Sequence, residues 1–100
     1  MPIKYLKGSE VKNLISKEDD KVRIINVFAE WCGPCKMMAP ILEEISQEHE
    51  VIKVDLDKNQ DFATDMKVQG VPATFIFKGD KLIKSITGYV AKEVITQNIK

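Results

Sequence analysis

The spacing of hydrophobic residues changes along the chain from unbroken runs to a helical repeat. Residues 22–28 (VRIINVF) form an apolar, β-branched run, which is typical of a strand covered on both faces. The hydrophobic residues that follow recur every three or four positions, as on one stripe of a helix: Met37, Met38, Ile41, Leu42 and Ile45. The pattern therefore predicts a central strand followed by a helix from Pro34 to about Glu48, with Pro40 inside it.

The remaining segments follow the same two patterns. Short apolar runs predict strands at residues 3–6, 51–56, 74–77 and 81–86. Helical spacing predicts helices within residues 8–15, 59–66 and 91–99. Ser9 and Ala91 are expected to be the N-caps of the first and last of these helices. A tight connection with glycine at residues 78–80 predicts that the last two strands pair as an antiparallel hairpin.

The order of these elements, βαβαβαββα, places the protein in the α/β class. It predicts a central mixed β-sheet flanked by helices on both faces. A chain of 100 residues, of which 44% are hydrophobic, suits one core and leaves no room for a second. We therefore expect a single domain over residues 1–100.

Charge and hydropathy argue against several kinds of partner. Fifteen basic and fifteen acidic residues cancel, so neither nucleic acid nor a membrane is indicated. No apolar run approaches membrane-spanning length, and the first residues lack the long apolar segment of an export signal. We therefore expect a cytoplasmic monomer in which cysteines rest as thiols.

The candidate chemistry lies in residues 31–36 (WCGPCK), at the junction between the central strand and the long helix. Cys32 falls near the helix N-terminus, where unpaired N–H groups and the helix dipole favour a thiolate. Cys35 lies one turn further on and is expected to point inward as a thiol. Disulfide exchange uses such a pair, with an exposed nucleophile and a sheltered thiol that resolves the mixed disulfide.

Two other roles are open to a cysteine pair. A structural zinc site needs four ligands, but the chain has these two cysteines and one histidine, His49, which falls near a helix end and suits capping there. An inert disulfide across two residues closes a loop too short to stabilise much. A CxxC pair at a strand–helix junction favours a redox role over both, and no metal site is expected.

Residues 29–40 (AEWCGPCKMMAP) resemble the active-site segment of thioredoxins, and residues 70–72 (GVP) and Gly88 match other marks of that family in order and spacing. The resemblance covers essentially the whole chain. It implies the thioredoxin fold and a protein-disulfide reductase in which Cys32 attacks and Cys35 resolves. It further implies that no cofactor binds the chain and that an NADPH-dependent flavoprotein, thioredoxin reductase, restores the dithiol.

The resemblance also implies a docking surface for client proteins around the cysteines. In the family, the proline at the position of Pro72 is cis and packs beside the sulfurs. The residue before it, Val71 here, offers backbone groups to an extended client strand. The implied surface is small and apolar, which suits many clients: Trp31, Gly33, Pro34, Val71, Pro72 and Gly88.

Asn26 departs from the family pattern, in which a buried aspartate lies beneath the inner cysteine and exchanges its proton. An amide cannot act as a base near neutral pH, so slower resolution by Cys35 and a more stable site are expected here. Lys53 neighbours that aspartate in the family, and without it we expect this lysine to extend to water. Glu30 is a candidate substitute base.

Two other functions remain open to this sequence. The same fold is used by disulfide oxidants and isomerases, although Gly33-Pro34 between the cysteines and the absence of an export signal argue against them. Alternatively, the chain is a non-enzymatic binding module in which the cysteines are incidental, a reading supported only by Asn26. Reduction of a protein disulfide that is lost on replacement of Cys32 excludes the binding module.

Overall fold

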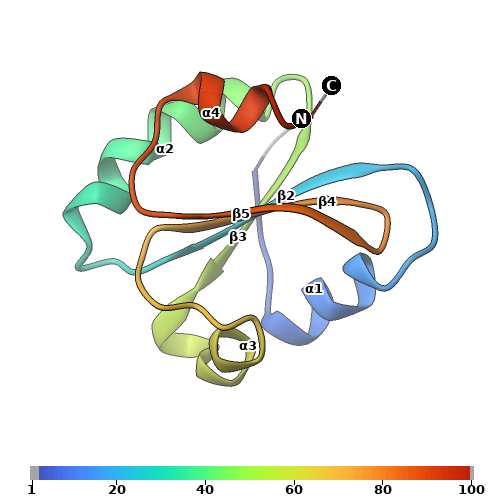
Figure 1. The fold of residues 1–100 in the computed structure, drawn as a ribbon. Coiled ribbons are helices and arrows are strands. Elements are labelled where there is room, and N and C mark those ends of the chain that lie inside the picture. The colour runs from blue at the N-terminus through green and yellow to red at the C-terminus, as the bar shows by residue number, and fades with distance from the viewer. Residues whose placement is uncertain (1–2, 100) are drawn as a thin grey trace.

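The structure, a computed structural model, describes residues 3–99 and contains a five-stranded sheet between two layers of helices (Figure 1). The strands are β1 (Lys4–Tyr5), β2 (Val22–Phe28), β3 (Glu50–Asp55), β4 (Ala73–Lys78) and β5 (Lys81–Thr87). The helices are α1 (Gly8–Ile15), α2 (Gly33–Ile45), α3 (Gln60–Asp65) and α4 (Lys92–Thr96). The predicted element order is confirmed, and a short 3₁₀ helix, η1 (Leu56–Lys58), is added before α3.

The sheet is mixed, as predicted, with the strand order β1-β3-β2-β4-β5. Strand β3 runs parallel to β1 and β2, whereas β4 is antiparallel to both β2 and β5. The central strand β2 brings Asn26 opposite Lys53 on one side and Thr74 on the other. This register places three polar side chains in a row across the middle of the sheet.

Two hydrophobic clusters fill the space on either side of the sheet. Helices α1 and α3 cover one face, and α2 and α4 cover the other (Figure 1). Successive side chains of β2 point to opposite faces, so Ile25 and Val27 belong to the first cluster and Ile24 belongs to the second. Each fully buried aliphatic side chain contributes about 1.5–3 kcal/mol. The apolar run at residues 22–28 thus forms a strand covered on both faces, as expected.

Helix α1 begins one residue before the predicted N-cap, Ser9, so that prediction was wrong. The Glu10 carboxylate accepts the Lys7 N–H at 2.9 Å, and the Asn59 side chain accepts the Gly8 N–H at 2.9 Å. These oxygens satisfy N–H groups that every helix leaves free at its start. Because Asn59 belongs to a distant segment, the local pattern gave no sign of this cap.

Helix α2 ends at Ile45, three residues before the predicted boundary at Glu48. The chain turns there, and the His49 N–H donates to the Ile45 carbonyl at 3.0 Å. Pro40 lies inside the helix as expected. Met37, assigned to the buried stripe by its spacing, is 61% exposed, so the stripe is narrower than the pattern indicated.

Helix α4 begins at Lys92, and its N-cap is Ala91, as predicted; the methyl side chain of Ala91 cannot accept a hydrogen bond from the helix. A serine hydroxyl at this position accepts a free N–H of the first turn. We therefore expect Ala91→Ser to raise the free energy of unfolding by about 1 kcal/mol. Urea denaturation followed by circular dichroism measures the change. Ala91→Val, which supplies no acceptor, is the control and should bring no gain; a lower melting temperature for Ala91→Ser would contradict the assignment.

Candidate active site

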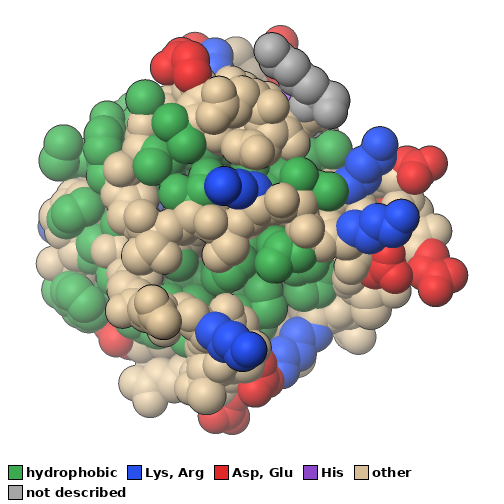
Figure 2. All heavy atoms as spheres, viewed as in Figure 1, with side chains coloured by type: hydrophobic (Ala, Val, Ile, Leu, Met, Phe, Trp, Pro, Cys, Tyr) green, Lys and Arg blue, Asp and Glu red, His purple; other side chains and the backbone are tan. Residues whose placement is uncertain are grey.

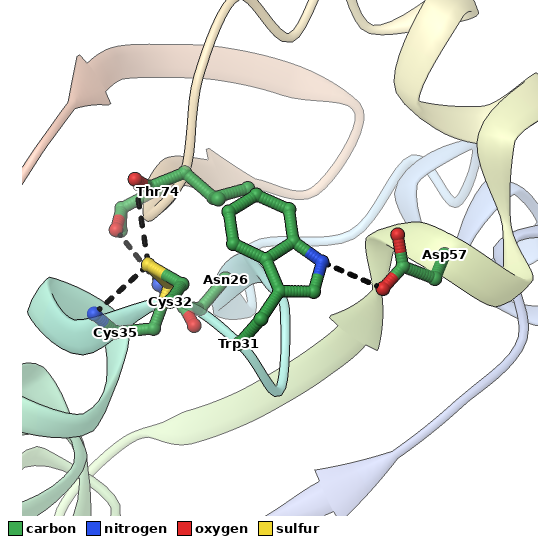
Figure 3. Close-up of a disulfide and its surroundings, with 7 residues drawn as sticks. Asn26, Trp31, Cys32, Cys35, Asp57 and Thr74 are labelled. Carbon is green, nitrogen blue, oxygen red and sulfur yellow. Dashed lines mark hydrogen bonds between the residues drawn. A yellow bond between two sulfur atoms is a disulfide. The ribbon is translucent and has the colours of Figure 1, made fainter.

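The two cysteines form a disulfide between the loop after β2 and the first turn of α2 (Figure 3). Cys32 is the N-cap residue of α2, and its sulfur accepts the Cys35 N–H at 3.2 Å. Pro34 occupies the first turn, where its missing N–H costs little. The predicted position of Cys32 at the helix N-terminus is confirmed, and a direct backbone hydrogen bond adds to the helix dipole there.

The predicted contrast between an exposed Cys32 and a sheltered Cys35 is absent from this disulfide form. Cys32 is 4% exposed and Cys35 is 5% exposed, because Phe28, Ala29 and Val71 pack around the pair. The two residues differ instead in their surroundings. The Cys32 sulfur lies 3.6 Å from the Val71 carbonyl oxygen, whereas Cys35 lines a cavity of about 250 Å³.

The Val71–Pro72 peptide bond is cis, as the family resemblance implied. Pro72 is buried and Val71 is half-buried. The Pro72 carbonyl accepts the Gly88 N–H at 2.7 Å, and Gly88 has φ of +94°, a conformation that suits glycine. Val71 therefore lies beside Cys32, and Pro72 is hydrogen-bonded to Gly88, which comes from the segment after β5.

Hydrophobic side chains gather on the surface near this end of the molecule (Figure 2). Trp31 is 67% exposed, and its indole N–H donates to Asp57 at 2.9 Å (Figure 3). Gly33 and Pro34 are exposed, as are Met37 and Tyr89. Sequence reasoning missed Asp57, because the contact joins residues 26 positions apart and Asp57 lies in a helix that was not predicted.

Asn26, on strand β2, is 1% exposed and belongs to the surroundings of the disulfide drawn in Figure 3. Its amide nitrogen donates to the Thr74 hydroxyl at 3.2 Å. Thr74 is fully buried and was also missed, because the strand register that pairs it with Asn26 cannot be derived from a single strand's pattern. The Asn26 side chain thus has a neutral hydrogen-bond partner, and no carboxylate takes the place of the missing aspartate at this pair.

Lys53 does not extend to water, so that prediction was wrong. The residue is 7% exposed, and its ammonium nitrogen lies 4.6 Å from the centre of the Phe28 ring and 5.7 Å from that of Tyr5. Burial lowers the pKa of Lys53, against the opposing charge of Glu43. The aromatic faces partly replace water around the cation. Glu30, the candidate base, is exposed and lines the same cavity as Cys35 and Lys53.

Among residues 3–99, the His, Cys, Asp and Glu side chains form no cluster of three that could hold a metal ion. Within the same described range, no helix has the length and apolar character needed to cross a membrane.

A CxxC disulfide at the start of a helix, next to a cis-proline loop and on a mixed sheet, defines a thiol–disulfide oxidoreductase. The sequence model of the family described as thioredoxin matches residues 2–100. The chain belongs to the thioredoxin family.

Individual relatives support this assignment. A thioredoxin of Buchnera aphidicola is 39% identical over 79 residues, covering 75% of this chain and 72% of the relative. A thioredoxin of Staphylococcus aureus is 34% identical over 86 residues, covering 82% of this chain and 83% of the relative. The reduced thioredoxin pre-protein of Schistosoma mansoni has a TM-score of 0.86 at 26% identity, covering 98% of this chain and 96% of that one.

The predicted thioredoxin fold and family membership are thereby confirmed. The chain is an oxidoreductase that reduces protein disulfides through a redox-active cysteine pair. Members of this family act on disulfide-containing client proteins and are generally reduced again by thioredoxin reductase.

Proposed function

We propose that Cys32 is the attacking thiolate and Cys35 the resolving thiol of this reductase. The carrying observation is that the Cys32 sulfur accepts the Cys35 N–H at the start of α2, a position that favours negative charge on Cys32. The Cys32 thiolate bonds to one client sulfur, and the other client sulfur leaves with the electron pair. The Cys35 thiolate then bonds to Cys32 and displaces the second client sulfur, so two electrons pass to the client.

We further propose that the client strand docks against Val71, opposite the exposed indole of Trp31. Two observations support this. Val71 is half-buried with its carbonyl oxygen 3.6 Å from the Cys32 sulfur, so a strand paired with it lies beside the nucleophile. The path of a client strand to Val71 is not blocked by large side chains, because the nearby residues are Gly33, Pro34 and Gly88. Pro72 is buried and joined to Val71 by the cis peptide bond, so it fixes the position of Val71.

The working context we propose is a cytoplasmic monomer formed by a single domain over residues 1–100. An NADPH-dependent thioredoxin reductase returns its disulfide to the dithiol. The bacterial thioredoxins among its relatives support this setting. The equal numbers of acidic and basic residues give no reason to add nucleic acid or an anionic membrane as a partner.

The test is reduction of insulin disulfides by dithiothreitol, followed by the turbidity of the released chains. The protein should accelerate the reaction, and Cys32→Ser should abolish the acceleration, because serine keeps the helix N-cap but removes the nucleophile. Circular dichroism of the variant establishes that it is folded. An unaccelerated reaction with folded protein and two free thiols would refute the proposed roles and favour a binding module.

A further inference from the structure

A cleft of about 610 Å³ lies at the carboxyl ends of the parallel strands, and its lining includes neither cysteine. The last residues of β1, β2 and β3 all line it: Tyr5, Phe28 and Asp55. After β2 the chain passes to α2, whereas after the neighbouring β3 it passes to α3 on the opposite face of the sheet (Figure 1). Small molecules bind α/β proteins at such a point, and the cleft has a volume typical of small-molecule sites.

Lys53 supplies an unpaired, buried cation to this cleft. The residue is 7% exposed and belongs to the lining. Among residues 3–99, no carboxylate forms an ion pair with its ammonium group, and its register neighbours, Tyr5 and Asn26, are uncharged. Burial accordingly lowers the pKa of Lys53. A bound anion would supply the counter-charge that the protein itself does not place on this ammonium group.

Two aromatic rings lie next to this cation. The Lys53 nitrogen is 4.6 Å from the centre of the Phe28 ring and 5.7 Å from that of Tyr5. The two rings meet edge to face, with their centres 6.0 Å apart. Tyr5 is nevertheless 67% exposed, and half-buried Leu6 follows it in the lining of the cleft. A flat apolar group placed there would cover the exposed ring and lose contact with water.

The other charges of the cleft limit how negative its ligand can be. The lining contains as many carboxylates as lysines, with Glu10, Glu30 and Asp55 opposed to Lys7, Lys53 and Lys58. Once a ligand pairs with Lys53, the remaining carboxylates outnumber the remaining lysines. Like charges repel, so a ligand with one negative charge suits the cleft better than a polyphosphate does.

We propose that this cleft binds a small aromatic monocarboxylate, whose carboxylate pairs with the Lys53 ammonium and whose ring packs against Tyr5. The two carboxylates nearest the strand and helix ends do not compete for the cation, because each accepts a backbone N–H. Glu10 accepts that of Lys7 at 2.9 Å, and Asp55 accepts that of Asp57 at 2.9 Å. Binding at this cleft involves no cysteine and is therefore an activity separate from disulfide exchange.

The direct test titrates the wild-type protein with phenylacetate and follows the backbone amide signals by NMR. Phenylacetate should bind with a Kd of about 1 mM or lower, as expected for a ligand with so few atoms. Phenylacetamide has almost the same shape but no charge, and it should bind about tenfold more weakly or worse. The signals that move should include those of Tyr5, Phe28 and Asp55, at the strand ends. Inorganic pyrophosphate should bind more weakly than phenylacetate.

Substitutions separate the contribution of the charge from that of the ring. Lys53→Met should weaken phenylacetate binding about tenfold and leave phenylacetamide binding unchanged, because only the acid uses the cation. Tyr5→Thr should weaken both ligands alike, by about threefold, because both use the ring. Lys84→Met, which removes an exposed lysine on β5, is the matched control and should change neither.

Each outcome bears on the proposal. A loss of phenylacetate binding confined to Lys53→Met and Tyr5→Thr supports it. The proposal would be overturned if phenylacetate produced no saturable shifts, if the amide bound as tightly as the acid, or if Lys53→Met bound both ligands as the wild type does. Shifts centred on Trp31 and Cys32 would place the ligand on the client surface and would also overturn it. The comparison of acid with amide uses the wild-type protein alone, so it decides the matter even if a variant fails to fold.

Discussion

Asn26→Asp is expected to speed resolution of the mixed disulfide by roughly ten- to a thousandfold while making the protein less stable. A carboxylate can accept the Cys35 proton, which the amide cannot do. The same carboxylate would be almost fully buried, since Asn26 is 1% exposed and has one hydroxyl partner, Thr74. An imperfectly paired buried polar group costs about 1–3 kcal/mol, and more when charged.

The loss of stability in this variant should depend on pH. Burial disfavours the charged carboxylate, so the folded protein holds the proton to higher pH than the unfolded chain does. The variant should therefore approach wild-type stability in acid and lose stability as the pH rises from the carboxyl pKa of the unfolded chain to the raised pKa of the folded protein. Urea denaturation at several pH values measures this.

Asn26→Leu serves as the control for the rate, because it changes the packing without adding a base. The acid-quenched lifetime of the mixed disulfide should be short in Asn26→Asp and unchanged in Asn26→Leu. Equal lifetimes in wild type and Asn26→Asp would show that proton acceptance at this position does not limit resolution.

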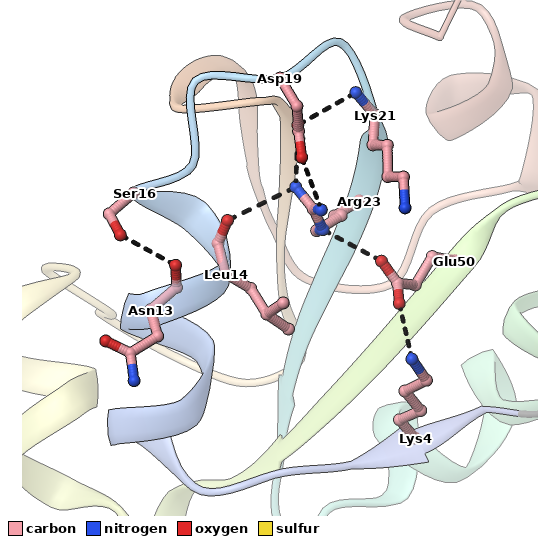
Figure 4. A network of polar contacts seen from close by, with 8 residues as sticks. All are labelled: Lys4, Asn13, Leu14, Ser16, Asp19, Lys21, Arg23 and Glu50. Carbon is pink, nitrogen blue, oxygen red and sulfur yellow. Dashed lines mark hydrogen bonds and ion pairs between the residues drawn. The ribbon is translucent and has the colours of Figure 1, made fainter.

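Arg23→Met is expected to lower the free energy of unfolding by about 1–3 kcal/mol, because it removes the buried central cation of a partly buried polar network (Figure 4). Arg23 is 2% exposed. Its guanidinium donates to Asp19 at 3.0 and 3.2 Å, to Glu50 at 3.0 Å and to the Leu14 carbonyl at 3.4 Å. These bonds tie the end of α1 and the following loop to β2 and β3.

The effect of Arg23→Met should shrink in acid. The hydrogen bond from Arg23 lowers the pKa of Asp19. Burial alone would raise the pKa of Glu50, but Lys4 and Arg23 together hold it below its usual value. Groups with a depressed pKa stabilise the fold above the pKa of the unfolded chain, and this contribution is lost as pH falls through the folded-state pKa.

Lys4→Met is the matched control for Arg23→Met, because Lys4 contacts the same Glu50 from an exposed position. An exposed pair of this kind contributes about 0.2–1 kcal/mol. Chemical denaturation at neutral pH and in stronger acid, below the ordinary range of carboxyl pKa values, compares the two variants with the wild type. A similar loss in both would mean that the buried guanidinium has no special role.

The sequence was sufficient to predict the strands and α-helices, but not their ends or the short helix η1. The run at residues 22–28 and the hairpin around Gly79 have strong local signals, and both form as expected. The N-cap of α1 was misplaced, and one of the two oxygens that accept N–H groups at its start comes from Asn59, 51 residues away. Boundaries fail where a partner from another segment outweighs the local preference.

The site shows the same division between local and distant contacts. The position of Cys32 and Cys35 on the fold follows from their spacing and from the strand and helix on either side. The environments of Lys53 and Trp31 do not, because they depend on Phe28 and Asp57, which reach them only after the sheet has formed. Lysine is a residue type typical of the protein surface, but the surroundings of Lys53 are those of a core residue.

Strand β5 lies at one edge of the sheet, and all of its residues except Ile86 are exposed. Leu82 and Ile83 are 51% and 45% exposed on this edge. Unpaired edges of this kind invite strands from other copies of the chain, and edge lysines oppose that pairing. Because acidic and basic residues cancel overall, long-range repulsion between copies is weak. Resistance to aggregation at this edge therefore depends on local charges, Lys81 and Lys84, and not on the net charge of the protein.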